Sequence, residues 1–218
     1  MTVYETARIH MVESQLRPNK VTDERLIDAF LRINREMFVP EALRGVAYID
    51  DDLPLGHGRY LMQPLVAARL LQALAIDPKD TALVVGAGVG YEAAVLSLLL
   101  RSVVAVEEDA ELARIGRSAL VDHRIASVTY AESAPGLGHR PRSPYNVILF
   151  SGAVEELPSE ISAQLGDGGR ISVVLRPRGS VGRATVIARA GGVLARRIIF
   201  DAAMPLLPGF APKPGFVF

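Results

Sequence analysis

The 218-residue sequence has no cysteine and no excess of either charge. The lack of cysteine excludes disulfides, thiolate nucleophiles and thiolate metal ligands within this chain, and it is compatible with a reducing compartment. Lys and Arg together number 24, as do Asp and Glu, whereas a protein that neutralises nucleic-acid phosphates usually has a basic excess. The composition therefore disfavours nucleic acid as a partner.

The sequence also shows no membrane-spanning run and no metal-binding motif, and from its first residues we expect no signal peptide. No apolar stretch approaches the ~20 residues that cross a bilayer, and the N-terminal MTVYETARIHMVESQ is charged and polar where a signal peptide would be apolar. The four histidines, His10, His57, His123 and His139, are too scattered to pair as metal ligands. We expect a soluble, cytoplasmic protein that needs no metal and binds no membrane.

Hydrophobic periodicity divides the chain into a helical beginning and an α/β remainder. Thr22 is the candidate N-cap of one helix, and Pro64 suits the first turn of another. From residue 81, short β-branched runs alternate with helical segments, which predicts βαβ units and a parallel sheet. The predicted strands are 81–85, 102–106, 127–131, 145–150 and 170–175, and the predicted helices between them are 91–100, 109–120 and 157–166.

Gly191-Gly192 separates two further β-branched runs and predicts a terminal antiparallel hairpin. A mostly parallel seven-stranded sheet with such an ending is typical of a Rossmann-like class I methyltransferase and less so of a dinucleotide dehydrogenase. We expect a single domain with three parts: a helical cover and substrate segment over 1–75, a Rossmann-like core over 76–200, and a C-terminal strap over 201–218. The cover should lie over the carboxyl ends of the strands, where α/β sheets bind ligands.

A glycine-rich loop, Gly86-Ala87-Gly88-Val89-Gly90, follows the first strand of this sheet and precedes a helix. Glycines permit a tight turn and let a ligand lie against bare backbone. The dinucleotide fingerprint requires another glycine where this chain has Tyr91, so a ligand without phosphates, such as S-adenosylmethionine, is favoured. An ordinary strand–helix turn is the alternative explanation. The candidate cofactor-binding residues here are Gly86, Ala87, Gly88 and Gly90.

Glu107 ends the next strand, where a carboxylate can accept both ribose hydroxyls of an adenosyl group. Its spacing from the glycine loop favours that role over a solvated strand end, and Glu108 is the second acidic candidate for the cofactor. Asp109 is expected to cap the following helix. Glu155 and Glu156 are equally consistent with a ligand contact and with the start of a helix.

Six segments, in this order, resemble the protein-L-isoaspartate O-methyltransferase family. The resemblance covers about residues 8 to 180. It implies S-adenosylmethionine or S-adenosylhomocysteine as the cofactor, and methyl transfer to an isoaspartyl carboxylate of a protein or peptide. Such a carboxylate, with a pKa near ~4, is ionised at pH 7, so positioning would matter more than a general base. The segments are 11–18, 35–44, 53–58, Gln63-Pro64, the glycine loop with 91–96, and 168–170.

The chain departs from the family pattern at several polar positions. Where the family has Gln-Thr-Ile-Ser at the substrate site, this sequence has Arg59-Tyr60-Leu61-Met62. The usual acid of the first strand is Val84, and the usual Asp of the fourth strand is Asn146. The family's Gly-Asp-Gly aligns with Ser133-Ala134-Pro135, although a small shift would let Glu132 replace the aspartate that reaches the adenine.

Met62 and His57 are the candidate residues of the substrate site. Met62 stands where the family has serine, and it either reshapes substrate choice or simply fills a gap in the core. His57 lies between two glycines of the same segment, with no partner carboxylate evident from the sequence.

Two functions of different classes are therefore open. The glycine loop and Glu107 favour a carboxyl methyltransferase that repairs damaged aspartyl residues. Val84, Met62 and the missing Gly-Asp-Gly favour a binding or scaffold protein that keeps the fold without turnover. A nicotinamide-dependent dehydrogenase is a distant third, because of Tyr91.

Overall fold

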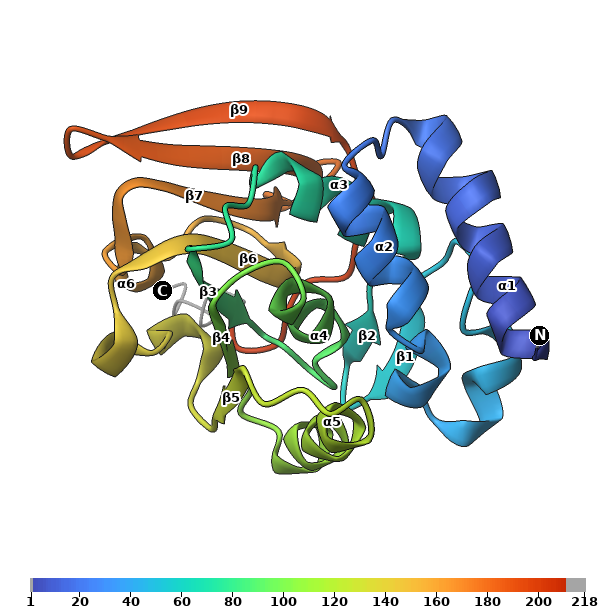
Figure 1. The fold of residues 1–218 in the computed structure, drawn as a ribbon. Helices are drawn as coiled ribbons and strands as arrows, with labels where there is room; N and C mark the ends of the chain where they lie inside the picture. The colour runs from blue at the N-terminus through green and yellow to red at the C-terminus, as the bar shows by residue number, and fades with distance from the viewer. Residues whose placement is uncertain (1, 211–218) are drawn as a thin grey trace.

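A seven-stranded sheet forms the centre of the computed structural model, which describes residues 2–210 (Figure 1). The strand order is β5-β4-β3-β6-β7-β8-β9, and β8 runs antiparallel to both of its neighbours while β5, β4, β3, β6 and β7 are parallel. This arrangement confirms the predicted fold class. The strands are β3 (Thr81–Val85), β4 (Ser102–Val106), β5 (Val128–Ala131), β6 (Tyr145–Val154), β7 (Leu165–Leu175), β8 (Arg183–Ala190) and β9 (Val193–Asp201).

Strand β3 shows why the central strands consist almost entirely of apolar residues. Its side chains alternate between two buried clusters, with Ala82 and Val84 on one face of the sheet and Leu83 and Val85 on the other. Successive side chains of a strand point to opposite faces, so a strand that is covered on both sides needs an unbroken apolar run.

The helices of the parallel core are shorter than predicted at one point. The segment predicted as a helix over 157–166 contains only α6 (Ser159–Ser162), because β7 already begins at Leu165. The other helices are α1 (Val3–Met11), α2 (Glu24–Arg32), α3 (Pro64–Ala73), α4 (Tyr91–Ser97) and α5 (Ala110–Asp122). The N-cap of α2 is Asp23, whose side chain accepts a hydrogen bond from the Arg25 N–H, and not the predicted Thr22.

Shorter helical turns connect these elements, and a small hairpin precedes α3. The hairpin pairs β1 (Leu53–Gly56) with β2 (Arg59–Leu61). A π-helical turn covers Val12–Leu16, and the 3-10 turns are Arg17–Asn19, Arg35–Phe38, Glu41–Val46, Pro135–Leu137 and Arg140–Arg142.

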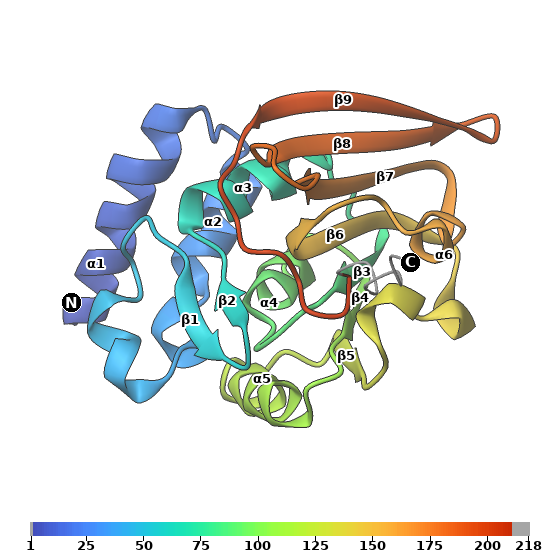
Figure 2. The ribbon, with the colours of Figure 1, turned by 180° about the vertical axis from the view of Figure 1, so that it is seen from behind.

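The N-terminal helices lie beside the sheet and do not cover the carboxyl ends of its strands as expected. Helices α1, α2 and α3 gather on one side of the molecule next to α4 (Figures 1 and 2), and α3 packs against β6, β7 and β8. Within 1–75, the β1–β2 hairpin reaches the carboxyl ends, because its Arg59 contacts Gly86 and Glu107. No helix in the described part of the chain is long and apolar enough to cross a membrane.

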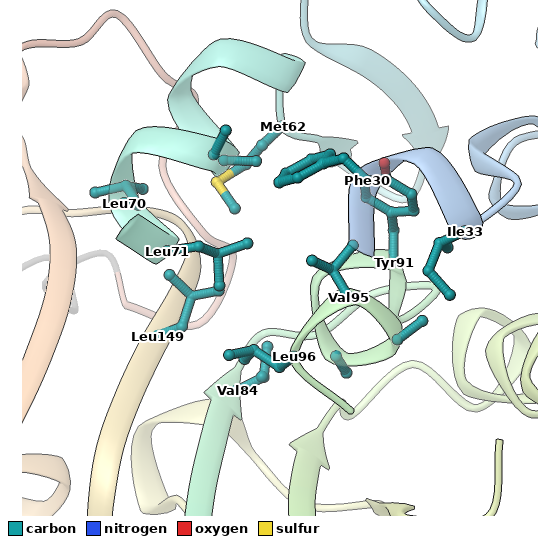
Figure 3. Close-up of a cluster of buried hydrophobic side chains, with 14 of the residues drawn as sticks. Phe30, Ile33, Met62, Leu70, Leu71, Val84, Tyr91, Val95, Leu96 and Leu149 are labelled. Carbon is teal, nitrogen blue, oxygen red and sulfur yellow. The ribbon is translucent and has the colours of Figure 1, made fainter. Parts of the chain in front are cut away.

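Tyr91 fastens the N-terminal helices to the core. Its side chain is completely buried at the start of α4, with ring centroids 6.1 Å from Phe30 and 5.5 Å from Phe38. The Arg35 guanidinium lies 4.9 Å from the centre of the Tyr91 ring. Figure 3 shows the Tyr91 ring beside Phe30 and Ile33 of the N-terminal segment. The residue that breaks the dinucleotide fingerprint is thus a packing residue of the core.

We expect Tyr91→Ala to lower the free energy of unfolding by about 3–5 kcal/mol, the usual cost of emptying a buried aromatic site. The matched variant Tyr91→Phe keeps the ring and should cost no more than about 1 kcal/mol, because the buried hydroxyl that it removes has no hydrogen-bond partner among the described residues. Urea unfolding followed by circular dichroism measures both values. Equal losses in the two variants would show that the hydroxyl, and not ring packing, provides the stability.

Candidate functional site

The glycine loop lies where the strand order reverses, since β4 flanks β3 on one side and β6 flanks it on the other. Ligands of open α/β sheets bind at the carboxyl ends of strands at such a point. Gly86, Gly88 and Gly90 have φ of 66°, 55° and 81°, values that favour glycine. The Ala87 N–H donates to the Val106 carbonyl at 2.9 Å, which ties the loop to the end of β4. The predicted loop residues therefore lie together at the carboxyl ends of β3 and β4.

Glu107 follows β4 directly and is fully buried beneath this loop. One carboxylate oxygen, Oε2, accepts the Gly88 N–H at 2.6 Å and lies 2.7 Å from the Arg59 Nη2. The other, Oε1, accepts the Asp109 N–H at 3.1 Å and Arg59 Nη1 at 3.2 Å. Both oxygens predicted to bind a ribose are thus already occupied by groups of this chain.

Arg59 is the partner that the sequence did not reveal. Its side chain is only 4% exposed, and besides Glu107 its Nη2 donates to the Gly86 carbonyl at 2.5 Å. Removing one partner of such a buried ion pair leaves an uncompensated charge, which costs about 3–5 kcal/mol. The only signal was that Arg59 belongs to the run that departs from the family pattern.

The C-terminal segment fills the remaining space above the glycine loop. The Ala153 N–H donates to the Pro205 carbonyl at 3.0 Å, and the Leu207 N–H donates to the Ala153 carbonyl at 2.8 Å. A Cβ atom at Gly86 would lie 2.9 Å from a methyl carbon of Leu207, and one at Gly152 would lie 2.4 Å from the same side chain. Figure 2 shows this segment passing beside β6 toward β3 and β4. Residues 211–218 of the predicted strap lie outside the described residues.

This arrangement offers the chemistry of an adenosyl site without the space for one. The residual cavity between the hairpin and the C-terminal segment has a volume of only about 10 Å³, which is room for about one water molecule. The glycines with positive φ and the Glu107 carboxylate suit the uncharged, hydroxyl-bearing adenosyl part of a ligand. S-adenosylmethionine does not fit while Arg59 and Leu207 occupy these positions.

His57 has a carboxylate partner, contrary to the expectation from the sequence. Its Nδ1 contacts Asp109 Oδ2, and Asp109 Oδ1 also accepts the N–H groups of Glu111 and Leu112, so it caps α5 as predicted. The hydrogen bond to Asp109 raises the pKa of His57, and the same bond lowers the pKa of Asp109. The pair ties the turn of the β1–β2 hairpin to the start of α5.

Met62 does not line a surface that a substrate could reach. Its side chain is completely buried and points into the core cluster of Figure 3, beside Phe30 and Leu71. Its carbonyl accepts Arg35 Nη2 at 2.7 Å. Of the two interpretations of Met62, the structure supports the one in which its side chain fills a gap in the core.

The remaining acidic residues considered as ligand contacts lie apart from one another and do not form a common site. Glu108 is exposed, and its Oε1 lies 3.4 Å from the position of a Cβ on Gly209. Glu132 pairs with Arg117, and both side chains are about half exposed. Glu155 and Glu156 lie in the turn between β6 and α6.

Asn146 is remote from the glycine loop. It accepts hydrogen bonds from Thr81 at the start of β3, whereas the loop follows the other end of this strand.

No group of three or more His, Cys, Asp or Glu side chains within residues 2–210 could hold a metal ion.

Glu92 is a buried carboxylate beside the loop that the sequence analysis overlooked. It is 2% exposed, and its Oε2 accepts the Ser151 hydroxyl at 3.4 Å, while Oε1 has no hydrogen-bond partner among the described residues. Burial raises the pKa of Glu92, and the nearby Arg35 charge opposes this only in part. The sequence did not mark Glu92 as a buried residue, because acidic residues are common in the first turn of a helix.

The sequence matches one family of known proteins. The model of the family protein-L-isoaspartate(D-aspartate) O-methyltransferase (PCMT) matches residues 7–194. Protein-L-isoaspartate O-methyltransferase of Koribacter versatilis (strain Ellin345) is 35% identical over 219 residues, with 97% of this chain and 96% of that protein covered. Protein-L-isoaspartate O-methyltransferase 2 of Anaeromyxobacter sp. (strain Fw109-5) is 38% identical over 185 residues, which cover 85% and 76% of the two chains.

Two solved structures share the fold. A structure of protein-L-isoaspartate O-methyltransferase superposes with a TM-score of 0.80 at 25% identity, covering 91% of this chain but 65% of that one. A Plasmodium falciparum structure, described as a beta-aspartate methyltransferase in complex with S-adenosyl-L-homocysteine, superposes with a TM-score of 0.81 and covers 96% and 100%. At 15% identity, the second similarity concerns the fold alone.

We expect Asp109→Asn to lower the pKa of His57 toward the ordinary ~6.5, while the asparagine still caps α5. Because the folded-state pKa of His57 is raised, the ion pair stabilises the fold fully below pH ~6.5 and loses this effect as the pH rises through the raised value. A histidine NMR titration measures the shift. Glu111→Gln is the control and should move the pKa less, since Glu111 acts only through its more distant charge. An unchanged titration in Asp109→Asn would contradict the pairing.

We expect Glu92→Gln to raise the free energy of unfolding at pH 8, because it removes a carboxylate whose ionisation is opposed by burial. The raised folded-state pKa means that this cost is absent below the ordinary value of 4.5 and grows as the pH rises through the raised one. Urea unfolding at several pH values should therefore show a difference that disappears toward pH 4. The exposed Glu156→Gln should change stability by no more than ~0.5 kcal/mol at any pH. A destabilising Glu92→Gln would mean that the charge is needed.

Proposed function

Because the chain belongs to the protein-L-isoaspartate(D-aspartate) O-methyltransferase family, we propose that it transfers a methyl group from S-adenosylmethionine to the carboxylate of an isoaspartyl residue. The substrate would be a protein or peptide with a damaged aspartyl site, as the names of its relatives imply. We also propose the cytoplasm as its location, since a cysteine-free chain is compatible with a reducing compartment.

The observation that best supports this activity is the left-handed glycine loop above Glu107 at the point where the strand order reverses. Backbone groups of Gly86, Gly88 and Gly90 and the Glu107 carboxylate are the groups with which this fold would hold an adenosyl ligand. S-adenosylmethionine supplies an activated methyl group when it is bound. The arrangement of Arg59 and Leu207 leaves no room for it, so we assign these residues no step in the transfer.

The chemistry of the substrate limits what the chain must contribute. An isoaspartyl carboxylate with a pKa near ~4 is already the nucleophilic anion at pH 7, so no general base is required. Orientation of the carboxylate and exclusion of water remain as the main requirements. We accordingly assign His57 and Asp109 to the attachment of the hairpin to the core and not to proton transfer.

A binding or scaffold protein that retains the fold without turnover is the second candidate. The specific observation in its favour is Arg59, which occupies both oxygens of Glu107. Such a protein would not transfer a methyl group, whether or not it binds S-adenosylmethionine.

We expect tritiated S-adenosylmethionine to label an isoaspartyl peptide as a base-labile methyl ester, and not to label the same peptide with ordinary aspartate. Gly88→Val should abolish the transfer, because it places a β-branched residue at a φ of 55° in the loop. Gly179→Val is the matched control: φ there is 73°, and nothing lies within 4 Å of an added Cβ. Its stability loss should be similar and its activity unchanged.

Equal labelling of both peptides would refute the isoaspartyl substrate. No labelling by the wild-type protein, under conditions in which S-adenosylhomocysteine binds, would favour the scaffold protein.

A further inference from the structure

We infer that this chain closes its own cofactor site with a two-part latch, namely Arg59 together with residues 204–207, and that cofactor binding requires both parts to move. This inference rests on the proposed function, because it concerns regulation of the same site. In the closed state the site holds the chain's own side chains in place of the adenosyl ligand.

The first part of the latch acts through charge. Glu107 is fully buried and forms four hydrogen bonds or ion-pair contacts, two of them with Arg59. Both a guanidinium and a ribose hydroxyl can donate charge-assisted hydrogen bonds to a carboxylate, but only the guanidinium also brings the opposite charge and a two-pronged set of donors. A ribose can therefore bind Glu107 only after the Arg59 guanidinium has found solvent or another anion.

The second part of the latch, residues 204–207, occupies the space that a ligand would need. The residues that follow it lie along the carboxyl ends of the neighbouring strands. Leu207 lies against Gly86, which directly follows β3, and against Gly152 in the last part of β6. The next residues touch the hairpin and the loops after β4 and β5. Cβ atoms added at Gly58, Gly209 and Gly136 would lie 3.6 Å from Pro208, 3.4 Å from Glu108 and 3.7 Å from Phe210, respectively. The ring centroid of Phe210 is 5.9 Å from that of Phe150 in β6.

Both parts can leave without disrupting the seven-stranded sheet. Residues 204–207 are held to it by two backbone hydrogen bonds with Ala153, and the Met204 carbonyl accepts Arg176 Nη1 at 2.9 Å. The pairing of Ala153 with Leu206 is an isolated bridge. Arg59 belongs to a three-residue strand of a separate two-stranded hairpin. Opening must also expose the buried side chains of Met204 and Leu207, but a segment with so few backbone bonds still opens at lower free-energy cost than a core strand.

A closed state of this kind reduces affinity in proportion to its population. The apparent dissociation constant equals the intrinsic one divided by the fraction of open molecules, so a closed-to-open ratio of ~100 weakens binding ~100-fold. Substitutions that weaken either part of the latch should therefore tighten cofactor binding, although they remove interactions from the protein.

Calorimetric titration with S-adenosylhomocysteine tests the latch on the full chain. Arg59→Gln removes the cation, and Leu207→Ala removes the side chain above Gly86; each should lower Kd at least tenfold relative to wild type. Arg170→Gln breaks the ion pair with Asp80, which lies 2.8 Å away at the other end of the sheet. Leu165→Ala truncates an equally buried leucine of the same cluster as Leu207. Both controls should keep the wild-type Kd, with folding of every variant verified by thermal melting.

The outcomes separate the latch from the proposed function. Equal Kd values for the wild type and both latch variants, together with methyl transfer by the wild type, would overturn the latch and leave the function intact. Tighter binding in the latch variants without methyl transfer would support the latch and refute the function. Absence of binding in every protein at millimolar ligand would overturn both.

A disulfide provides the converse experiment. The chain has no cysteine of its own, so Ala153→Cys combined with Leu206→Cys creates a single possible bridge between paired positions. The oxidised protein should bind S-adenosylhomocysteine at least tenfold more weakly than the reduced one. Equal binding by the two forms would overturn the latch.

Discussion

The carboxyl ends of the central strands are organised around one fully buried and fully compensated carboxylate, that of Glu107. Its position is dictated by the sheet, since it is the first residue after β4 and lies under the glycine loop. Four groups from three separate parts of the chain converge on its two oxygens. The loop after β3, the approach to α5 and the β1–β2 hairpin are thereby held at mutually fixed positions.

The other end of the hairpin segment is fixed by packing and not by charge. Met62 directly follows β2 and enters the core, and its carbonyl is bound by the buried Arg35. Arg35 also reaches the Ala47 carbonyl and lies over the ring of Tyr91. Two arginines, Arg35 and Arg59, therefore connect the N-terminal third of the chain to the parallel core, one through the core and one at the edge of the sheet.

The parts of the site that could be predicted are those formed by neighbours in the sequence. The glycine loop and Glu107 each follow a strand with a clear β-branched pattern, so their place at the carboxyl edge follows from topology alone. Arg59 pairs with a residue 48 positions away, and His57 with one 52 positions away. No periodicity reports such distant pairs, and an arginine in a polar-looking turn is most often solvated.

The expectation about Met62 shows the opposite difficulty. Its place in the family pattern suggested a substrate contact, while its apolar side chain suited the core equally well, and only the packing around it separates the two. The helical cover was misplaced for a related reason. Amphipathic periodicity identifies the buried face of a helix without indicating which layer of the domain buries it.

The mutual dependence of Arg59 and Glu107 also constrains how the protein can diverge over generations. Loss of either residue alone leaves a buried charge without its counterion, so single replacements pass through an intermediate less stable than either end point. The two positions are thus epistatic, because the loss of stability on replacing either residue depends on whether the other is still present. A buried ion pair of this kind therefore limits which single substitutions the two positions tolerate during evolution.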